Sequence, residues 1–112
     1  MPLNSKQKGA RYERELAAYF KAKGYDTRRT AQYCGNTGEA ADVQGLPYTH
    51  IECKHQETLR LKDWVEQAVR DCKEGDLPAV FHRKNNEKTL VTMRLDDWME
   101  LYKGYEKSRG TE

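Results

Sequence analysis

Apolar residues recur at intervals of three or four in three stretches of the chain, which predicts three helices. The first helix is expected over residues 5–23, with Ser5 as its N-cap and Gly24 as the residue that ends it. Its apolar stripe consists of Tyr12, Leu16, Tyr19 and Phe20. The second helix is expected over residues 61–73 and would end by Gly75. Its apolar stripe consists of Leu61, Trp64, Val65, Ala68, Val69 and Cys72.

The third helix is predicted to begin at Asp96 or Asp97 and to stop near Gly104. The side chains that it would turn toward the core are Trp98, Leu101 and Tyr102. The aromatic residues of this region are interpreted as core or dimer-interface residues rather than as platforms for stacked bases, and they are Trp98, Tyr102 and Tyr105. Residues 1–5 and 106–112 are expected to form flexible tails of a single domain that spans residues 1–112.

Shorter apolar runs between turn-forming residues predict five strands. They lie near residues 25–30, 41–43, 51–54, 78–82 and 89–93. A polar loop over residues 32–39 separates the first two strands, and the Gly and Pro within residues 45–48 predict a reversal between the second and third. The last two strands would be joined by a turn at Asn85-Asn86. The resulting order, αβββαββα, predicts an α/β fold with a mixed β-sheet flanked by helices.

Composition narrows the class of protein. The chain has 112 residues, of which 37% are apolar and 34% charged, and this balance suits one small domain with a modest core. No apolar run approaches the length that spans a bilayer, and the polar N-terminus is not typical of a signal peptide. The three cysteines lack paired spacing, which is typical of free thiols, and they are Cys34, Cys53 and Cys72. We therefore expect a cytoplasmic protein without a membrane partner.

The net charge is only +2, but its distribution along the chain is uneven. Eight basic residues crowd the first thirty positions: Lys6, Lys8, Arg11, Arg14, Lys21, Lys23, Arg28 and Arg29. A basic block on a nearly neutral chain is the pattern of a surface that contacts phosphate groups. A solvated helix surface would show the same pattern, so composition leaves both interpretations open.

The strongest candidate for chemistry is the pair of strands around Asp42 and Glu52. If these strands run antiparallel, Asp42 lies opposite or diagonal to Glu52, with the two residues about 5 to 8 Å apart. That separation allows both carboxylates to hold one divalent cation. The period of two in a strand places Glu52 and Lys54 on one face, and Ile51 and Cys53 on the other. Two carboxylates beside an ammonium group favour metal-assisted hydrolysis of a phosphodiester.

The same residues have simpler interpretations. Glu-x-Lys is common on solvated strand faces, where a pair of opposite charges contributes little. The histidines and cysteines lack the spacing of a zinc finger, and nothing in the sequence marks one thiol as an activated nucleophile. Gln67 lies off the apolar stripe of the second helix, so it would face either solvent or the active site.

Four motifs follow one another in a familiar order. Residues 8–16 begin Lys-Gly and carry Glu-Arg-Glu, and a pair of arginines ends the first strand. Ala41-Asp42-Val43 and Ile51-Glu52-Cys53-Lys54 follow. Together with the order of elements, these motifs resemble the restriction-endonuclease-like nucleases of the PD-(D/E)xK type, and more narrowly the archaeal and phage Holliday junction resolvases. The chain departs from that pattern at Ala41, where many relatives have Pro, but this position ligates nothing.

The resemblance implies a site for magnesium, with manganese as a substitute. Asp42 and Glu52 would bind the metal, helped by the backbone carbonyl of Cys53. Lys54 would orient or deprotonate the attacking water, or stabilise the pentacovalent phosphate. An acid of the first helix would reach the same metal, directly or through water.

Helix geometry alone does not choose between Glu13 and Glu15 for that acid, because they lie on opposite flanks of the apolar stripe. The resemblance favours Glu13, since it matches the first acid of the Glu-Arg-Glu motif. The candidates to grip the DNA backbone are Lys8, Arg11, Arg14, Arg28 and Arg29.

From the resemblance we expect a magnesium-dependent endonuclease that hydrolyses phosphodiester bonds in branched DNA, such as a four-way junction, during phage-type recombination or DNA processing. It would act in the cytoplasm of a bacterial or phage-infected cell. Resolving a junction requires two symmetric cuts, which predicts a homodimer. The alternatives are a nickase or nuclease of the same fold without junction preference, a non-catalytic nucleic-acid-binding module, and a structural protein with a coincidental Glu-x-Lys.

Overall fold

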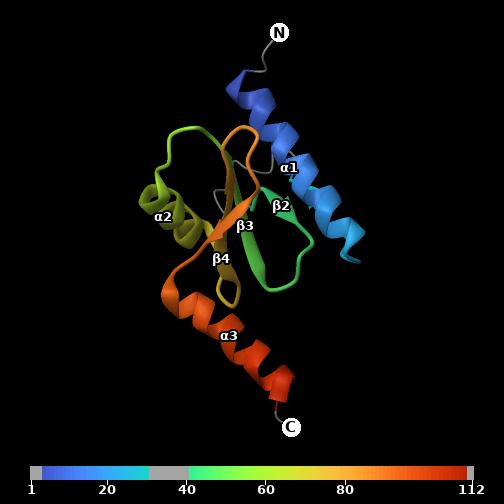
Figure 1. Ribbon diagram of the computed structural model, residues 1–112, viewed down its shortest axis with the longest axis vertical. Coiled ribbons are helices and arrows are strands. Elements are labelled where there is room, and N and C mark those ends of the chain that lie inside the picture. Colours follow the sequence, from blue (N-terminus) through green and yellow to red (C-terminus); the bar gives the residue numbers. More distant parts are fainter. Residues whose placement is uncertain (1–3, 31–40, 111–112) are drawn as a thin grey trace.

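The computed structural model describes residues 4–30 and 41–110, so the predicted loop over residues 32–39 lies outside the described residues. Figure 1 shows a central sheet with three helices around it. The helices are α1 (Ser5–Ala22), α2 (Leu61–Asp71) and α3 (Leu95–Gly110). The strands are β1 (Arg28–Arg29), β2 (Val43–Gln44), β3 (Thr49–His55), β4 (Leu77–Arg83) and β5 (Leu90–Thr92). The mixed α/β fold and the element order predicted from the sequence are confirmed.

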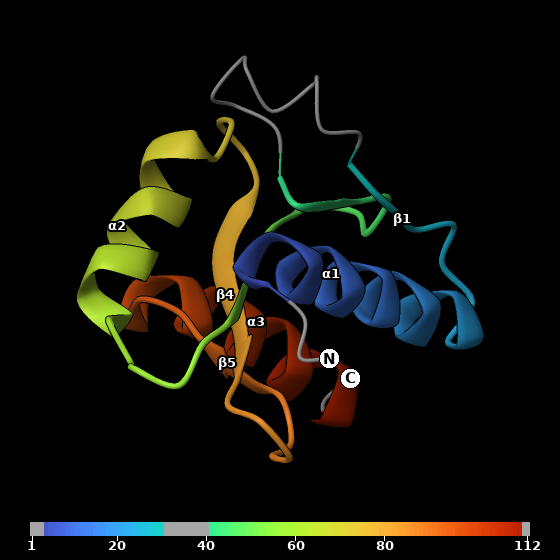
Figure 2. The ribbon, with the colours of Figure 1, turned by 90° about the horizontal axis from the view of Figure 1, so that it is seen from above.

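The five strands lie side by side in chain order. Only β3 and β4 run parallel, and α2 connects them; the remaining neighbours are antiparallel. Figure 2 shows α1 and α2 on opposite sides of β4. The α1 side holds the larger core cluster, built from Tyr12, Leu16, Ala17, Phe20, Val43, Ile51 and Cys53. The α2 side holds a smaller cluster of Trp64, Ala68 and Val80.

The N-terminus of α1 differs from the prediction. Asn4, not Ser5, is the N-cap: its side chain accepts a bond from the backbone N–H of Gln7, whose side chain in turn accepts one from the Asn4 N–H. This reciprocal pair satisfies two backbone N–H donors at the start of the helix. The N-cap is therefore one residue earlier than predicted, and Ser5 is the first residue of the helix. Gly24 follows the helix with a φ of +105°, as predicted for the residue that ends it.

The reversal between β2 and β3 forms where the sequence predicts it. Gly45 has a φ of +105°, and a Cβ there would lie 2.1 Å from the backbone oxygen of Asp26. No other residue fits that approach without moving the backbone. The first strand is shorter than predicted, because Thr27 is turned into the core and donates its hydroxyl to the Ala17 carbonyl at 2.7 Å.

The second helix also ends early. Its last residue is Asp71, and Cys72 has extended backbone angles, so the helix stops before the predicted residues 72–73. Gly75 has a φ of +95° and lies in the following turn rather than at the helix end. Trp64 and Ala68 are buried as the stripe predicts, whereas Leu61 is exposed.

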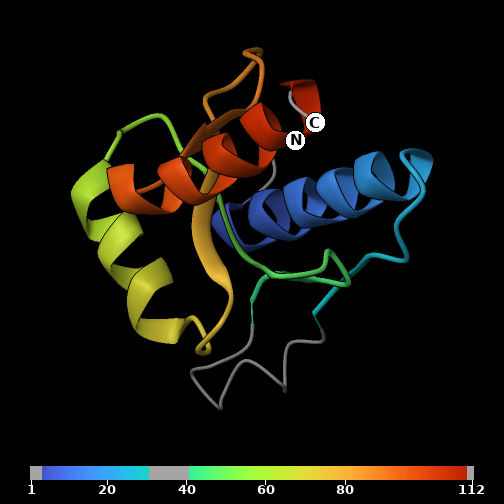
Figure 3. The same cartoon turned by 90° about the horizontal axis from the view of Figure 1, so that it is seen from below.

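The last helix shows the largest departure from the sequence prediction. It continues to Gly110 instead of stopping near Gly104, because a glycine inside a helix costs only about 1 kcal/mol and no proline follows it. Trp98, Leu101 and Tyr102, predicted to face the core, are exposed. Figure 3 shows α3 crossing in front of the other elements, and no described element packs along its length. None of the helices in the described part of the chain has the length and apolar content needed to cross a bilayer.

Candidate active site

Strand β3 carries the Glu-x-Lys motif through the middle of the sheet. Ile51 and Cys53 face α1 and belong to its core cluster, as predicted. The alternate residues His50, Glu52 and Lys54 therefore face the side of α2. The two faces of β3 thus have different tasks, because one supplies the hydrophobic core and the other presents polar groups.

Asp42 lies directly before β2, across from Glu52. Val43 pairs with Ile51 in the antiparallel register, which places Asp42 opposite Glu52, one of the two arrangements that the sequence leaves open. The Asp42 N–H donates to the Ile51 carbonyl at 2.8 Å, and the Asp42 carboxylate accepts a bond from the Cys53 N–H at 2.8 Å. Backbone and side chain of Asp42 are both tied to β3, so its position relative to Glu52 is set by the sheet.

Glu13 joins these two acids from α1. Burial, followed by repulsion from Glu52, raises the pKa of Asp42 to about 7, and Glu13 adds to the rise. Burial also raises the pKa of Glu13, while the bond from Arg29 Nε to Glu13 Oε1 at 2.7 Å opposes that rise. Three carboxylates that repel one another in a partly buried place form an environment that a divalent cation would stabilise.

The donor set consists of carboxylate oxygens. No group of three or more His, Cys, Asp or Glu side chains within residues 4–30 and 41–110 is arranged so that it could hold a metal ion. Asp42 and Glu52 are two hard oxygen donors, and magnesium in proteins is held by one or two carboxylates with water and substrate phosphate. Burial raises the pKa of the Cys53 thiol, which disfavours the thiolate that zinc binding or nucleophilic attack requires.

His50 supports Glu52 on the same face of β3, and sequence reasoning did not assign it to the site. Its Nε2 and the Glu52 Oε1 share a hydrogen bond of 2.7 Å, and both residues are buried. The contact follows from the period of two, which places residues i and i+2 on one face of a strand. The spacing of two residues between His50 and Glu52 was therefore the signal in the sequence that could have predicted this contact.

Gln67 reaches the site from α2. Its Oε1 accepts a bond from the Lys54 Nζ at 3.0 Å. From the sequence, Gln67 could face either solvent or the active site. The fold directs it to Lys54. The bond holds the ammonium group, which would otherwise have free rotation on a long side chain.

Comparisons with known proteins identify the family. A family described as phage putative PDDEXK endonucleases matches residues 4–111. The chain belongs to this family. It is also similar to the solved structure of Hjc from Archaeoglobus fulgidus, a Holliday junction resolvase, with 25% sequence identity and a TM-score of 0.55. That match covers 77% of this chain and 72% of Hjc. A comparison with curated protein sequences gave no significant match.

These findings confirm the resemblance to PD-(D/E)xK nucleases and make the protein a member of a nuclease family. The residues that the sequence predicts for the catalytic motif are Asp42, Glu52 and Lys54. The register of β2 and β3 sets Asp42 opposite Glu52, and Lys54 lies on the same face of β3 as Glu52.

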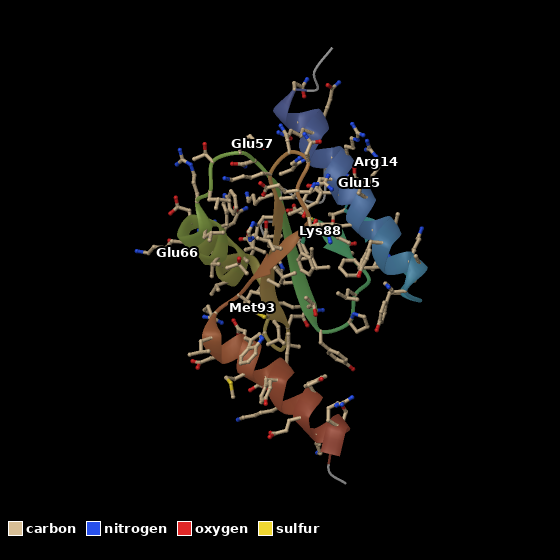
Figure 4. The ribbon with its side chains drawn as sticks, viewed as in Figure 1. Arg14, Glu15, Glu57, Glu66, Lys88 and Met93 are labelled. Carbon is tan, nitrogen blue, oxygen red and sulfur yellow. The ribbon has the colours of Figure 1, made fainter. Side chains whose placement is uncertain are left out.

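The predicted DNA-contacting residues differ in exposure and partners. Arg11, Arg14 and Arg28 are exposed, and Figure 4 labels Arg14 on α1 beside Glu15. Arg29 bonds to Glu13, Arg11 Nε lies 3.6 Å from Glu15 Oε1, and Lys8 lines the cleft described next. Glu15 thus pairs with Arg11 and Arg83, whereas Glu13 is the acid that α1 contributes near Asp42.

A basic cleft of about 450 Å³ lies at the end of β3. Its lining is Lys8, Arg11, Glu15, His55, Arg83, Asn85 and Asn86. The guanidinium of Arg83 lies over the Tyr12 ring at 4.8 Å and bonds to Glu15 at 2.9 Å, so its position is fixed. A neighbouring cleft of about 370 Å³ shares Lys8 and His55 and is also lined by Lys54. Cationic groups therefore continue from the Glu-x-Lys motif toward the turn after β4.

Proposed function

We propose that this protein is a magnesium-dependent DNA endonuclease that hydrolyses phosphodiester bonds and selects branched DNA, such as a four-way junction. The observation that carries the proposal is the register that sets Asp42 opposite Glu52, with Lys54 on the same face of β3 as Glu52. Family membership supports the hydrolytic chemistry, and the likeness to Hjc supports the choice of a branched substrate.

Asp42 and Glu52 would hold the cation, with the Cys53 carbonyl and Glu13 as further oxygen donors. Magnesium, or manganese in its place, supplies Lewis acidity toward a phosphate oxygen when bound. Lys54 would either take a proton from the attacking water or stabilise the charge that develops on the phosphate. Gln67 would keep the Lys54 amine directed at the reacting phosphate, and His50 would hold one oxygen of Glu52.

The DNA backbone would cross the basic surface around α1. Lys8 and Arg11 line the cleft, and Arg14 and Arg28 are further exposed cations that would contact the backbone. Arg29 has a second task, because its bond to Glu13 holds an acid of the site. Two symmetric cuts would require two copies of the site, so we infer a homodimer acting in phage-type DNA recombination or processing.

The decisive experiment compares cleavage of a labelled four-way junction and a linear duplex of equal length, with magnesium, by the wild type and Asp42→Asn. Glu66→Gln is the matched control, because Glu66 is an exposed acid of α2 (Figure 4). Paired cuts in the junction alone, lost in Asp42→Asn and kept in Glu66→Gln, are expected.

Two other outcomes correspond to two of the alternatives. Equal cutting of both substrates would retain the catalytic site and replace the junction resolvase with a nickase or nuclease of the same fold. Junction binding without cutting under magnesium or manganese would overturn the enzyme and leave a nucleic-acid-binding module.

A further inference from the structure

Helix α3 presents an apolar face that nothing in the described part of the chain covers. Its large apolar residues are between 40% and 71% exposed, and they are Leu95, Trp98, Leu101, Tyr102 and Tyr105. The Trp98 and Tyr102 rings stack with their centroids 5.2 Å apart, and the Tyr105 ring follows 6.4 Å from Tyr102. The spacing of three and four residues puts this set on one side of the helix.

Such a face is costly in water. Each large apolar side chain that becomes buried contributes about 1.5–3 kcal/mol, and contiguous exposed patches of this kind mark interaction sites. No element among the described residues packs against the apolar face of this 16-residue helix. We therefore infer that the face is covered by a partner.

The charges along α3 indicate what the partner is. Its first half carries exposed Asp96 and Glu100, whereas Asp97 is buried and bonded to Arg94 at 2.8 Å. Its second half carries Lys103, Lys107 and Arg109 with one acid, Glu106. Two copies of α3 placed antiparallel set the acidic half of one against the basic half of the other. The positive N-terminal end of each helix dipole then lies beside the negative C-terminal end of the other, which is favourable. A parallel pair would place like charges together.

The same charges disfavour other occupants. The acidic first half would repel DNA phosphates. A helix that lies on a membrane surface usually has a basic polar face, which this half lacks. A second copy satisfies both the apolar face and the charges, and a two-fold axis makes each contact occur twice.

We propose that α3 is the homodimer interface of this protein and that two copies pack antiparallel through the face formed by Leu95, Trp98, Leu101, Tyr102 and Tyr105. The proposal deepens the homodimer of the proposed function and rests on that function only for the use of two active sites. Figure 1 shows that α3 lies at the end of the molecule away from the point where β3 ends. Pairing through α3 therefore leaves Lys54, near the end of β3, open to DNA.

The first test is the mass in solution, measured by light scattering without DNA or divalent metal. The wild type is expected at twice 13.1 kDa. The double variant Trp98→Gln, Leu101→Gln is expected at one protomer mass with an unchanged circular dichroism spectrum. The control is Tyr48→Asn, which removes an apolar side chain that is 79% exposed and should leave the dimer intact. A wild type of one protomer mass at all concentrations would overturn the proposal, as would a double variant that stays dimeric.

A second variant leaves the apolar face untouched, in case the double variant fails to fold. Lys103→Glu with Arg109→Glu reverses the charge of the second half and should raise the dimer dissociation constant about tenfold, because symmetry counts each pair twice. No change in the dissociation constant would overturn the antiparallel arrangement of charges.

Cross-linking tests the orientation. With Cys34 and Cys72 replaced by Ser, Leu101→Cys lies near the middle of the helix and should join two copies through a short bismaleimide. Leu95→Cys lies near one end and should not, because an antiparallel partner places its own residue 95 at the far end. Cross-linking at residue 95 would show a parallel pair. These measurements need no cleavage, so a failed dimer and a failed nuclease are told apart.

Discussion

His50 Nε2 and Glu52 Oε1 lie 2.7 Å apart on one face of β3, with both side chains buried. Burying a carboxylate without such a partner costs desolvation free energy, and the side chain would be free to rotate away from a metal. The bond to His50 therefore occupies one carboxylate oxygen of Glu52, the Oε1 atom. Glu52 thus depends on the sheet for its position and on His50 for the orientation of its side chain.

Replacing His50 by Phe should lower magnesium affinity and cleavage by about 10- to 100-fold, the usual effect of losing a residue that orients a metal ligand. Titration calorimetry with magnesium measures the affinity without relying on cleavage. His82→Gln is the matched control, because His82 is also buried on the α2 side and bonds to Thr92 at 2.8 Å instead of to an acid. Equal losses in both variants would indicate a general effect on stability.

Gln67→Leu should reduce the cleavage rate about tenfold while leaving DNA affinity and thermal stability nearly unchanged, because it removes only the bond to Lys54 at 3.0 Å. Lys54→Met should abolish cleavage. Single-turnover cleavage with saturating enzyme separates the rate from the affinity, and Gln56→Leu, at an exposed position after β3, serves as control. A Gln67→Leu enzyme with the wild-type rate would show that the bond has no part in catalysis.

The stability of the metal-free protein should fall as the pH rises from about 4 to 7. The folded pKa of Asp42, about 7, lies above its ordinary value of 3.8, so the folded state binds the proton more tightly than the unfolded state does. Its contribution is complete below the ordinary value and is lost as the pH rises through 7. Thermal melts in EDTA between pH 4.5 and 8.5 measure this trend. Asp42→Asn should flatten it and melt higher than the wild type at pH 8, while a variant with the wild-type slope would exclude Asp42 as the cause.

Magnesium should reverse that loss at pH 8. A cation that binds only the folded state at 100 times its dissociation constant adds about 2.7 kcal/mol to the free energy of unfolding. Urea unfolding with and without magnesium measures the difference, and Asp42→Asn should show little of it. Sodium chloride at the same ionic strength controls for screening by salt. Equal stabilisation of the wild type and Asp42→Asn would place the cation elsewhere.

Arg83→Gln should weaken junction binding and reduce the salt dependence of the binding constant by about one phosphate contact. Arg83 lines the basic cleft and is held there by Tyr12 and Glu15. Fluorescence anisotropy across a salt series, in calcium to prevent cleavage, provides the slope. Arg70→Gln removes an arginine whose side chain is 69% exposed on α2 and should leave the slope unchanged. Identical salt-dependence slopes for the wild type and Arg83→Gln would show that DNA does not contact the cleft at Arg83.

The sequence by itself determined much of the local structure and which residues form the motif. Alternation along β3 separated Ile51 and Cys53 from Glu52 and Lys54, and the turn residues between β2 and β3 placed Asp42 opposite or diagonal to Glu52. These relationships depend on neighbours in the chain and on the period of a strand, so they can be predicted without knowing the rest of the fold.

Only the tertiary structure decided which distant side chains meet. The bond between Gln67 and Lys54 depends on how α2 packs on the sheet, and the cleft beside Arg83 depends on where α1 crosses it. The outward position of Trp98 was beyond sequence reasoning for the same reason. A helical apolar stripe records that one face avoids water, but the identity of the surface that covers it is a property of the whole fold and its assembly.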